Sequence, residues 1–320
     1  MHATHPHPIP YQGSKRRLAP VIARHFPRAI STLYEPFAGS AAITLYAARH
    51  DLAHRFVIGD SLPALVGLWR GIVERPHETA DRYRRLWWRQ HADEEHFNRV
   101  RECWNRERDP VDLLYLICRC VKNAVRFNAR GEFTQSADRR RFGMHPDRMR
   151  SAIEGASGLL RGRVEIRCGD WLQTCTDAGA NDFVYLDPPY FGTTVGRDKR
   201  YHAQLARDAL IGGLSQLRTR NVPFALSYDG ACGNKLYGPA LPDHLRLARL
   251  LLDAGRSAQA TLSGRNERTI ESLYLSAPAD SADSSPFANR SMHTRTRQPA
   301  PRSRIMRLAG TRPRDTRRAP

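Results

Sequence analysis

The chain has 320 residues and carries a formal net charge of +19 at pH 7, with a pI of about 10.4. Its length allows one large or two ordinary domains and is sufficient to bury a hydrophobic core. The excess of Lys and Arg indicates a polyanionic partner, most often a nucleic acid, although a basic tail on a neutral enzyme would raise the charge in the same way. Because Arg139-Arg140-Arg141 lies in the middle of the chain, the tail explains only part of the excess.

The cysteines give no sign of a metal site. There are 6 of them, scattered and without a Cys-x-x-Cys pair, a pattern typical of reduced thiols in a cytosolic protein. No stretch approaches the length of a transmembrane span, and residues 1–10 lack the apolar core of a signal peptide. We therefore expect a cytoplasmic protein that binds neither a metal nor a membrane and begins with a loose N-terminus over residues 1–10.

The first motif along the chain is Tyr11-Gln12-Gly13-Ser14-Lys15, before a predicted helix. Gly13 lets the backbone approach a ligand closely, and Lys15 adds a positive charge. A solvated lysine before a helix explains the same residues.

A strand, an acidic turn and a helix are predicted next, over residues 30–45. The turn has no phosphate-gripping glycine loop, and Glu35 would repel a pyrophosphate but suits a cationic group. An ordinary β-α turn accounts for Gly39 but not for Glu35. A second predicted strand, residues 55–59, ends at Asp60, in the position of an acid that binds ribose hydroxyls in nucleoside-binding α/β folds.

The middle of the chain is helical and basic. Residues 68–108 predict amphipathic helices whose four tryptophans lie in a core, and residues 111–125 predict a more apolar helix. The segment from Arg126 to Phe133 then interleaves arginine, aromatic and asparagine residues around a glycine. This composition is typical of a loop that reads nucleic acid, although a solvated basic loop fits as well.

The sheet resumes with a predicted strand at residues 163–168, followed by Gly169-Asp170, and another at residues 183–186. Further on we predict a helix at 205–217, a strand at 222–227, and a hairpin of residues 257–262 and 269–275. After residue 276 the composition becomes rich in Ser, Pro and Arg, which predicts disorder.

The chain is organised around the sequence that follows the strand at 183–186, which reads Asp187-Pro188-Pro189-Tyr190. The prolines stiffen this loop just beyond the carboxyl end of a buried strand, where ligands bind in open α/β sheets. The Asp187 carboxylate and the Pro188 carbonyl are two acceptors side by side, which suits an exocyclic amino group. Tyr190 adds a flat ring beside them, so the motif predicts a site for the amino group of a nucleobase, against the alternative of a simple turn.

Together these motifs resemble those of the Dam-like, or α-group, DNA N6-adenine methyltransferases, over roughly residues 8 to 276. Asp187 to Tyr190 matches the catalytic motif of that family letter for letter, and Arg126 to Phe133 resembles its recognition segment. The cofactor motifs are similar too: they are residues 11–15, residues 35–40, Asp60, and Gly169-Asp170. The chain departs from the family at Ala41, where many relatives have a further glycine, and at Ser227-Tyr228-Asp229, where Ser-Asn is frequent.

The resemblance implies an α/β fold: a Rossmann-like, S-adenosylmethionine-dependent methyltransferase sheet with an inserted, mainly helical target-recognition domain. The implied catalytic domain covers residues 11–69 and 159–276, the insert covers 70–158, and a basic disordered tail covers 277–320. The partner is double-stranded DNA, bound by a monomer that requires no cognate restriction endonuclease. The implied activity is methyl transfer from S-adenosyl-L-methionine to N6 of a flipped-out adenine.

The site residues implied by the motifs fall into three groups, and none binds a metal. The catalytic group is Asp187, Pro188 and Tyr190. The cofactor-binding group is Tyr11, Lys15, Glu35, Phe37, Gly39, Asp60 and Asp170. The DNA-binding group is Arg126, Phe127, Asn128, Arg130, Arg139, Arg140 and Arg141.

Other functions remain as alternatives. A cytosine-N4 methyltransferase uses the same acceptors, but usually has Ser in place of Asp187. An RNA or protein-glutamine methyltransferase usually has Asn there. A catalytically silent nucleic-acid-binding protein would need none of the four acids Glu35, Asp60, Asp170 and Asp187. A dehydrogenase is disfavoured because the chain lacks a dinucleotide-binding loop.

Overall fold

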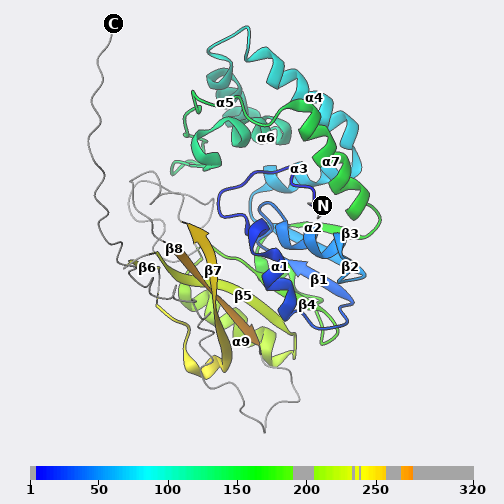
Figure 1. Cartoon of the computed structure of the whole chain (residues 1–320), viewed down its shortest axis with the longest axis vertical. Helices are drawn as coiled ribbons and strands as arrows, with labels where there is room; N and C mark the ends of the chain where they lie inside the picture. The colour runs from blue at the N-terminus through cyan, green and yellow to red at the C-terminus, as the bar shows by residue number, and fades with distance from the viewer. Residues whose placement is uncertain (1–4, 190–204, 233–234, 238, 257–267, 277–320) are drawn as a thin grey trace, which may run out of the picture. The chain divides into compact units, whose positions relative to one another are not determined.

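One mixed β-sheet runs through the described part of the chain (Figure 1). The computed structural model describes residues 5–189, 205–232, 235–237, 239–256 and 268–276. The strands follow the order β3-β2-β1-β4-β5-β8-β7, and β6 pairs with β5. Their bounds are β1 Thr32–Glu35, β2 Arg55–Asp60, β3 Val164–Cys168, β4 Phe183–Leu186, β5 Phe224–Cys232, β6 Lys235–Tyr237, β7 Leu247–Arg256 and β8 Arg268–Ser276.

The first five strands in this order are parallel, whereas β8 runs antiparallel to both β5 and β7. The helices are α1 Ala19–Ile22, α2 Ala42–Arg49, α3 Pro63–Glu74, α4 Pro76–Arg89, α5 His96–Glu107, α6 Pro110–Arg119, α7 Pro146–Leu160, α8 Trp171–Thr174 and α9 Arg207–Thr219. The predicted α/β fold of a Rossmann-like methyltransferase is confirmed.

Both faces of the sheet are covered, which explains the unbroken apolar run of β4. Side chains alternate between the faces along a strand. Phe183 and Tyr185 pack in the cluster that contains α1 and α2, whereas Val184 and Leu186 pack in the cluster that contains α8 and α9. All four residues of β4 are therefore buried.

Helices α4, α5 and α6 are grouped on one side of the molecule, beyond α3 and α7 (Figure 1). Four of the helices in this region begin with a proline, whose fixed φ suits the first helical turn. Trp69, Trp87 and Trp104 are buried, as predicted. The prediction that all four tryptophans lie in a core is wrong for Trp88, which is 52% exposed. Trp88 directly follows Trp87 on the helix, so its side chain faces another direction.

The expected boundaries of the insert fall inside continuous helices. Helix α3 crosses 69/70 and α7 crosses 158/159, and the Ser157 hydroxyl donates to the Val73 carbonyl at 2.7 Å. Residues Met1–Asp283 form one unit. A separate recognition role for residues 70–158 therefore stays a proposal about function, and the expected tail at 277–320 lies outside the described residues.

Two predicted elements differ from the structure. The helix expected over 111–125 ends at Arg119, because Lys122 and Asn123 adopt left-handed φ angles of 60° and 53° and the Asn123 side chain donates to the Ile117 carbonyl. The expected hairpin paired residues 257–262 with residues 269–275, whereas in the structure β8 pairs with β7 on one side and with β5 on the other. Residues 257–262 themselves lie outside the described residues.

The strand β7 was missed because its apolar residues do not alternate. Leu250, Leu251 and Leu252 are consecutive, yet Leu252 is buried and Leu251 is exposed. Among the described helices, none has both the length and the apolar character needed to cross a bilayer.

Candidate active site

The candidate site lies at the carboxyl ends of β1 and β4, which are neighbouring parallel strands. From β1 the chain continues to β2 on one side of the sheet, and from β4 it continues to β5 on the other side. Such a switch point opens a crevice in which α/β proteins bind ligands. Glu35 is the last residue of β1, and Asp187 follows the last residue of β4.

Asp187 lies in a cluster of three charged side chains. The Lys15 ammonium group is 2.8 Å from Oδ1 of Asp187 and 3.5 Å from Oε2 of Glu271, which lies on β8. The side chains of Lys15, Asp187 and Glu271 are only 7%, 20% and 18% exposed. Two carboxylates therefore share one buried cation at the switch point.

Sequence reasoning missed Glu271 and expected Lys15 beside the cofactor. The one available signal was an acid inside a predicted strand, Ile270-Glu271-Ser272-Leu273. That β8 pairs with β5, and so brings Glu271 to the first motif of the chain, depends on long-range strand pairing that no local pattern shows.

Burial raises the pKa values of both acids at the switch point. The pKa of Asp187 rises to about 6 because burial outweighs the opposing attraction of Lys15, and the charge of Glu271 raises it further. Burial raises the pKa of Glu35 to about 7, against the hydrogen bonds from Thr44, and the charge of Asp187 adds to the effect. The carboxylate form of Asp187 thus prevails only above a pH of about 6.

The turn after β1 is held by hydrogen bonds from three sides. Asp60 accepts from the Gly39 N–H at 3.2 Å, and the Trp69 indole donates to the Gly39 carbonyl at 3.0 Å. The Ser40 hydroxyl donates to the Ser14 hydroxyl at 2.8 Å, which joins this turn to the first motif. The turn and the Lys15 loop therefore form one rigid wall of the crevice.

Two residues of this turn have left-handed backbones. Gly39 has a φ of 47°, which costs glycine little, and Ala41 has a φ of 45°, where an alanine is strained. The departure at Ala41 thus occurs at a position where the backbone favours glycine. Glu35 joins the turn to α2, because its Oε2 accepts a hydrogen bond of 2.7 Å from the Thr44 N–H in the first turn of that helix.

The remaining expected cofactor residues border the same turn. Phe37 is half-buried with its ring 5.9 Å from the ring of Trp171, and Asp170 is exposed and caps α8 through the Leu172 N–H at 2.8 Å. Tyr11 is half-buried, and its ring lies next to Gly39. Carboxylates and aromatic rings around a small-residue turn fit a cationic ligand that carries a ribose and a purine.

The segment from Arg126 to Thr134 forms a short hairpin on α5. Phe127 and Phe133 make an antiparallel bridge, and Phe133 exchanges two backbone hydrogen bonds with the Asn105 side chain. Phe127 is 3% exposed and packs against Trp104. Its expected contact with DNA is therefore corrected: Phe127 lies in the core of the insert, where it cannot stack on a base.

At the hairpin tip, the Asn128 side chain forms hydrogen bonds within the loop. Its Oδ1 accepts from the backbone N–H groups of Arg130 and Glu132 at 2.9 and 3.0 Å, and its Nδ2 donates to the Glu132 carboxylate. Arg130 is 80% exposed and forms an ion pair with Glu132 at 2.9 Å. Arg126 is half-buried and donates to the Val125 carbonyl. Arg130 is thus the member of this group most open to an external partner.

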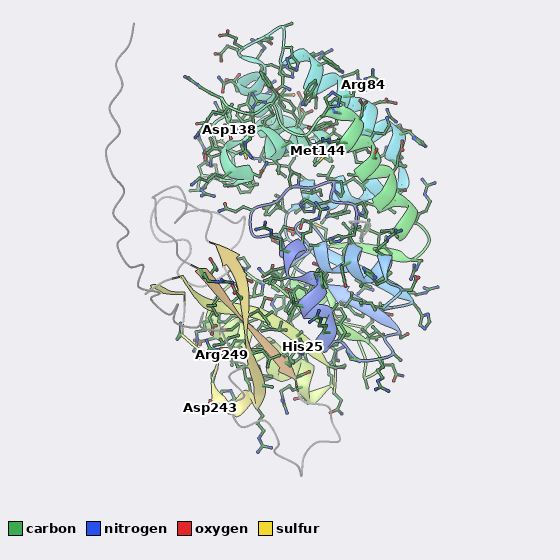
Figure 2. The ribbon with its side chains drawn as sticks, in the orientation of Figure 1. His25, Arg84, Asp138, Met144, Asp243 and Arg249 are labelled. Carbon is green, nitrogen blue, oxygen red and sulfur yellow. The ribbon has the colours of Figure 1, made fainter. Side chains whose placement is uncertain are left out.

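The second basic loop is fixed by α6. The buried Arg119 guanidinium donates to the carbonyls of Asp138 and Arg141, and the Asp138 carboxylate in turn pairs with Arg141. Arg139, Arg140 and Arg141 are all exposed. Figure 2 labels Asp138 and Met144, which flank this loop on the insert. The loop offers a cluster of guanidinium groups on a fixed backbone.

Of the expected catalytic residues, Asp187 and Pro188 are described and Tyr190 lies outside the described residues. Pro188 is buried directly beside Asp187 in the chain. The structure therefore brings Lys15, Glu35 and Asp187 together at the switch point, whereas the expected DNA-binding residues lie on the insert.

Comparison with known proteins gives a family match over most of the chain. Residues 11–253 match the family model described as D12 class N6 adenine-specific DNA methyltransferase. The chain is 25% identical over 226 residues to the Type II methyltransferase M.FokI of Planomicrobium okeanokoites, a match that covers 69% of the chain and 35% of that protein. It is 23% identical over 234 residues to the DNA N-6-adenine-methyltransferase of Escherichia phage P1, covering 69% and 29%.

A third relative is nearer in length. The chain is 26% identical over 186 residues to the DNA adenine methylase of Serratia marcescens, which covers 57% of the chain and 66% of that protein. The chain thus spans about a third of the length of the first two relatives, at 35% and 29%.

Proposed function

Because the chain belongs to the family of D12 class N6 adenine-specific DNA methyltransferases, we propose that it transfers a methyl group from S-adenosyl-L-methionine to N6 of an adenine in double-stranded DNA. The observation that carries the proposal is the position of Asp187, a shielded carboxylate directly after β4 at the switch point of the sheet. The family implies S-adenosyl-L-methionine as the methyl donor.

The catalytic role of Asp187 follows from its acceptor oxygens. Together with the Pro188 carbonyl it accepts the two hydrogens of N6, which draws the nitrogen lone pair out of conjugation. The carboxylate would then stabilise the positive charge on N6 as its bond to the methyl carbon forms and the carbon–sulfur bond of the sulfonium breaks to leave a neutral thioether, after which N6 would lose one proton. Catalysis on this scheme consists of positioning and electrostatics, and it needs no covalent enzyme intermediate.

The target adenine has to leave the duplex, because base pairing hides its amino group. Tyr190 is assigned to stack on the flipped base, a contact worth roughly 1–3 kcal/mol per base. Its position next to the stiff Pro188-Pro189 pair supports this role.

The crevice beside the turn after β1 is assigned to the methyl donor, which supplies an electrophilic methyl group on a sulfonium. Asp60 would hold the ribose, while Phe37 and Asp170 would hold the adenine. Tyr11, Lys15 and the turn at Glu35 and Gly39 would enclose the methionine end. These assignments are supported by the acidic and aromatic lining of the crevice. They also agree with the fixed backbone of the turn, to which Glu35 contributes through α2.

The insert is assigned to the DNA. Arg130 would reach a base edge from the hairpin tip, and Arg139 to Arg141 would contact phosphates from the loop that α6 holds. Asn128 supports the reading residue by shaping the tip, through the two backbone N–H groups that it accepts. The half-buried Arg126 would assist from the base of the hairpin.

The experiment that tests the function is a methylation assay with labelled S-adenosyl-L-methionine. Two randomised duplex libraries serve as substrates: one contains all four ordinary bases, and the other is identical except that 2-aminopurine replaces every adenine. An RNA copy of the first library is tested beside them. We expect N6-methyladenine in the first library and no label in the second. Label recovered as N4-methylcytosine, label on RNA alone, or cofactor binding without transfer would overturn the proposal.

A further inference from the structure

Glu271 is an acid in the interior of the sheet. Its strand, β8, lies between β5 and β7, and Glu271 is opposite Gly230 on one side and Leu252 on the other. A carboxylate that is 18% exposed in such a place needs a compensating partner. Lys15 supplies it at 3.5 Å, from the other end of the chain.

The Lys15 ammonium group has three hydrogens to donate, and three acceptors from the described part of the chain lie near it. These are the Gly13 carbonyl at 3.4 Å, Asp187 Oδ1 at 2.8 Å and Glu271 Oε2 at 3.5 Å. Among the residues that the structure describes, the charged groups that face Asp187 are Lys15 from the first motif, Glu271 from β8 and Glu35 from β1. Lys15 thus contacts the carboxylates of both Asp187 and Glu271, and Glu35 lies nearby.

We propose that Glu271 is a positioning residue for the active site: by holding Lys15 from the side of β8, it keeps this lysine from neutralising Asp187. The inference rests on the proposed function, because it concerns how well Asp187 accepts the hydrogens of an amino group. An ion pair confined to Lys15 and Asp187 would withdraw electron density from the acceptor. A second carboxylate on the same lysine adds negative charge to the cluster opposite the developing charge on N6.

The proposal gives Glu271 an effect on the pH dependence of turnover. Asp187 has to be ionised, so activity falls as the pH falls through its pKa. The negative charge of Glu271 raises that pKa. The acidic limb of the pH–rate profile, where the rate falls as Asp187 is protonated, therefore lies at a higher pH than it would with Lys15 alone. Removing the charge moves the limb downward and weakens the acceptor at the same time.

The test compares single-turnover rates against pH for the wild type, Glu271→Gln and Glu271→Asp, on a duplex that the wild type methylates. For Glu271→Gln we expect the acidic limb to fall by roughly one pH unit, the lower end of the effect of a neighbouring charge. We also expect a several-fold loss of the plateau rate. Glu271→Asp keeps the charge one methylene further away, so its limb lies between the other two. Cofactor affinity should be unchanged in both variants.

A matched control removes another acid from the same pair of strands. Asp253 on β7 is 44% exposed and pairs with Arg268, so Asp253→Asn should leave the limb and the plateau where they are. An unshifted limb with an unchanged plateau in Glu271→Gln would overturn the inference while leaving the wild-type activity in place. If Glu271→Gln does not fold, Glu271→Asp decides alone, because a limb identical to that of the wild type contradicts the proposal. Absence of N6-methyladenine with the wild type would instead overturn the proposed function.

Discussion

The proposed mechanism requires the Asp187 carboxylate to stay charged in a place that disfavours charge. Its burial raises its pKa to about 6, and Lys15 at 2.8 Å opposes that rise. Asp187 is therefore mostly ionised at neutral pH, but it becomes protonated when the pH falls a little below that. A hydrogen-bond acceptor of this kind is strong because it is poorly solvated.

Replacing Asp187 with Asn is expected to abolish most of the turnover while cofactor binding remains. The amide keeps the size of the side chain but loses the charge opposite N6, and loss of one such interaction typically costs roughly a hundredfold to a thousandfold in rate. Single-turnover methylation and calorimetric titration of S-adenosyl-L-methionine measure the two effects. Turnover near that of the wild type would contradict the assigned role.

Glu35 is expected to lower the stability of the protein at neutral pH. In the unfolded chain its carboxyl loses the proton near its ordinary pKa of 4.5, whereas in the folded protein it keeps the proton up to about 7. Between these values the folded state binds more protons, so the free energy of unfolding falls as the pH rises. Glu35→Gln, whose amide oxygen can still accept from Thr44, removes this effect.

We therefore expect Glu35→Gln to be more stable than the wild type at pH 8 by about 1–3 kcal/mol, with the difference vanishing towards pH 4.5. Urea unfolding at a series of pH values measures it. Glu78→Gln is the control, because Glu78 is 75% exposed and should show no such trend. The same difference at pH 5 and pH 8 would contradict the account.

At the scale of elements, the parallel half of the sheet could be predicted and the antiparallel half only in part. The strands β1, β2 and β4 are short, mainly apolar runs and β3 alternates apolar and charged residues, and each of the four ends at or just before an acid or a glycine. All of these are local patterns. In β7, consecutive leucines hide the alternation, and its pairing with β8 is settled by packing. Glu271 was missed for the same reason, since its neighbours in space come from distant parts of the sequence.

The hairpin on α5 shows where composition misleads. Its aromatic residues suggested base stacking, yet Phe127 and Phe133 close a core with Trp104. The sequence does not distinguish a phenylalanine in a core from one in a binding loop. Only the packing around the side chain does. The arginine at the tip could be predicted, because a charged side chain at a turn remains in solvent.

Arg130→Ala is expected to relax the sequence preference at one base pair, with S-adenosyl-L-methionine affinity unchanged. A bidentate arginine contact to a base edge gives roughly 1–3 kcal/mol of discrimination. Methylation of a randomised duplex library, read by sequencing, measures the preference. The control is Arg106→Ala, since Arg106 is 70% exposed on α5 and pairs with Glu107, and it should keep the wild-type motif.

The structure also changes how Asn128 has to be tested. Asn128→Ala would remove the acceptor of two backbone N–H groups and distort the tip, so loss of specificity would have two causes. Asn128→Asp keeps that acceptor and removes only the amide donor. If Arg130→Ala and Asn128→Asp both keep the wild-type motif and lose only rate, the hairpin positions DNA and the reading residues lie elsewhere.

At the scale of the whole molecule, the positive charge is divided between the insert and the C-terminal segment. Residues 284–320 contain ten arginines and one acid. Deleting them should weaken DNA binding and flatten its dependence on salt, because fewer counterions are released, while the methylated sequence stays the same. A full-length variant with these arginines changed to glutamine is the control for chain length. A changed methylation motif after either alteration would show that this segment reads bases.

The order of the strands in the sheet also bears on how the protein is made. Strand β8 is the last of the described strands to leave the ribosome, yet it lies between β5 and β7. Until residue 276 has emerged, β7 lacks the strand it pairs with and β5 presents an open edge to other nascent chains. Glu271 belongs to that same strand, so its ion pair with Lys15 can form only after β8, the last of the described strands, has been synthesised.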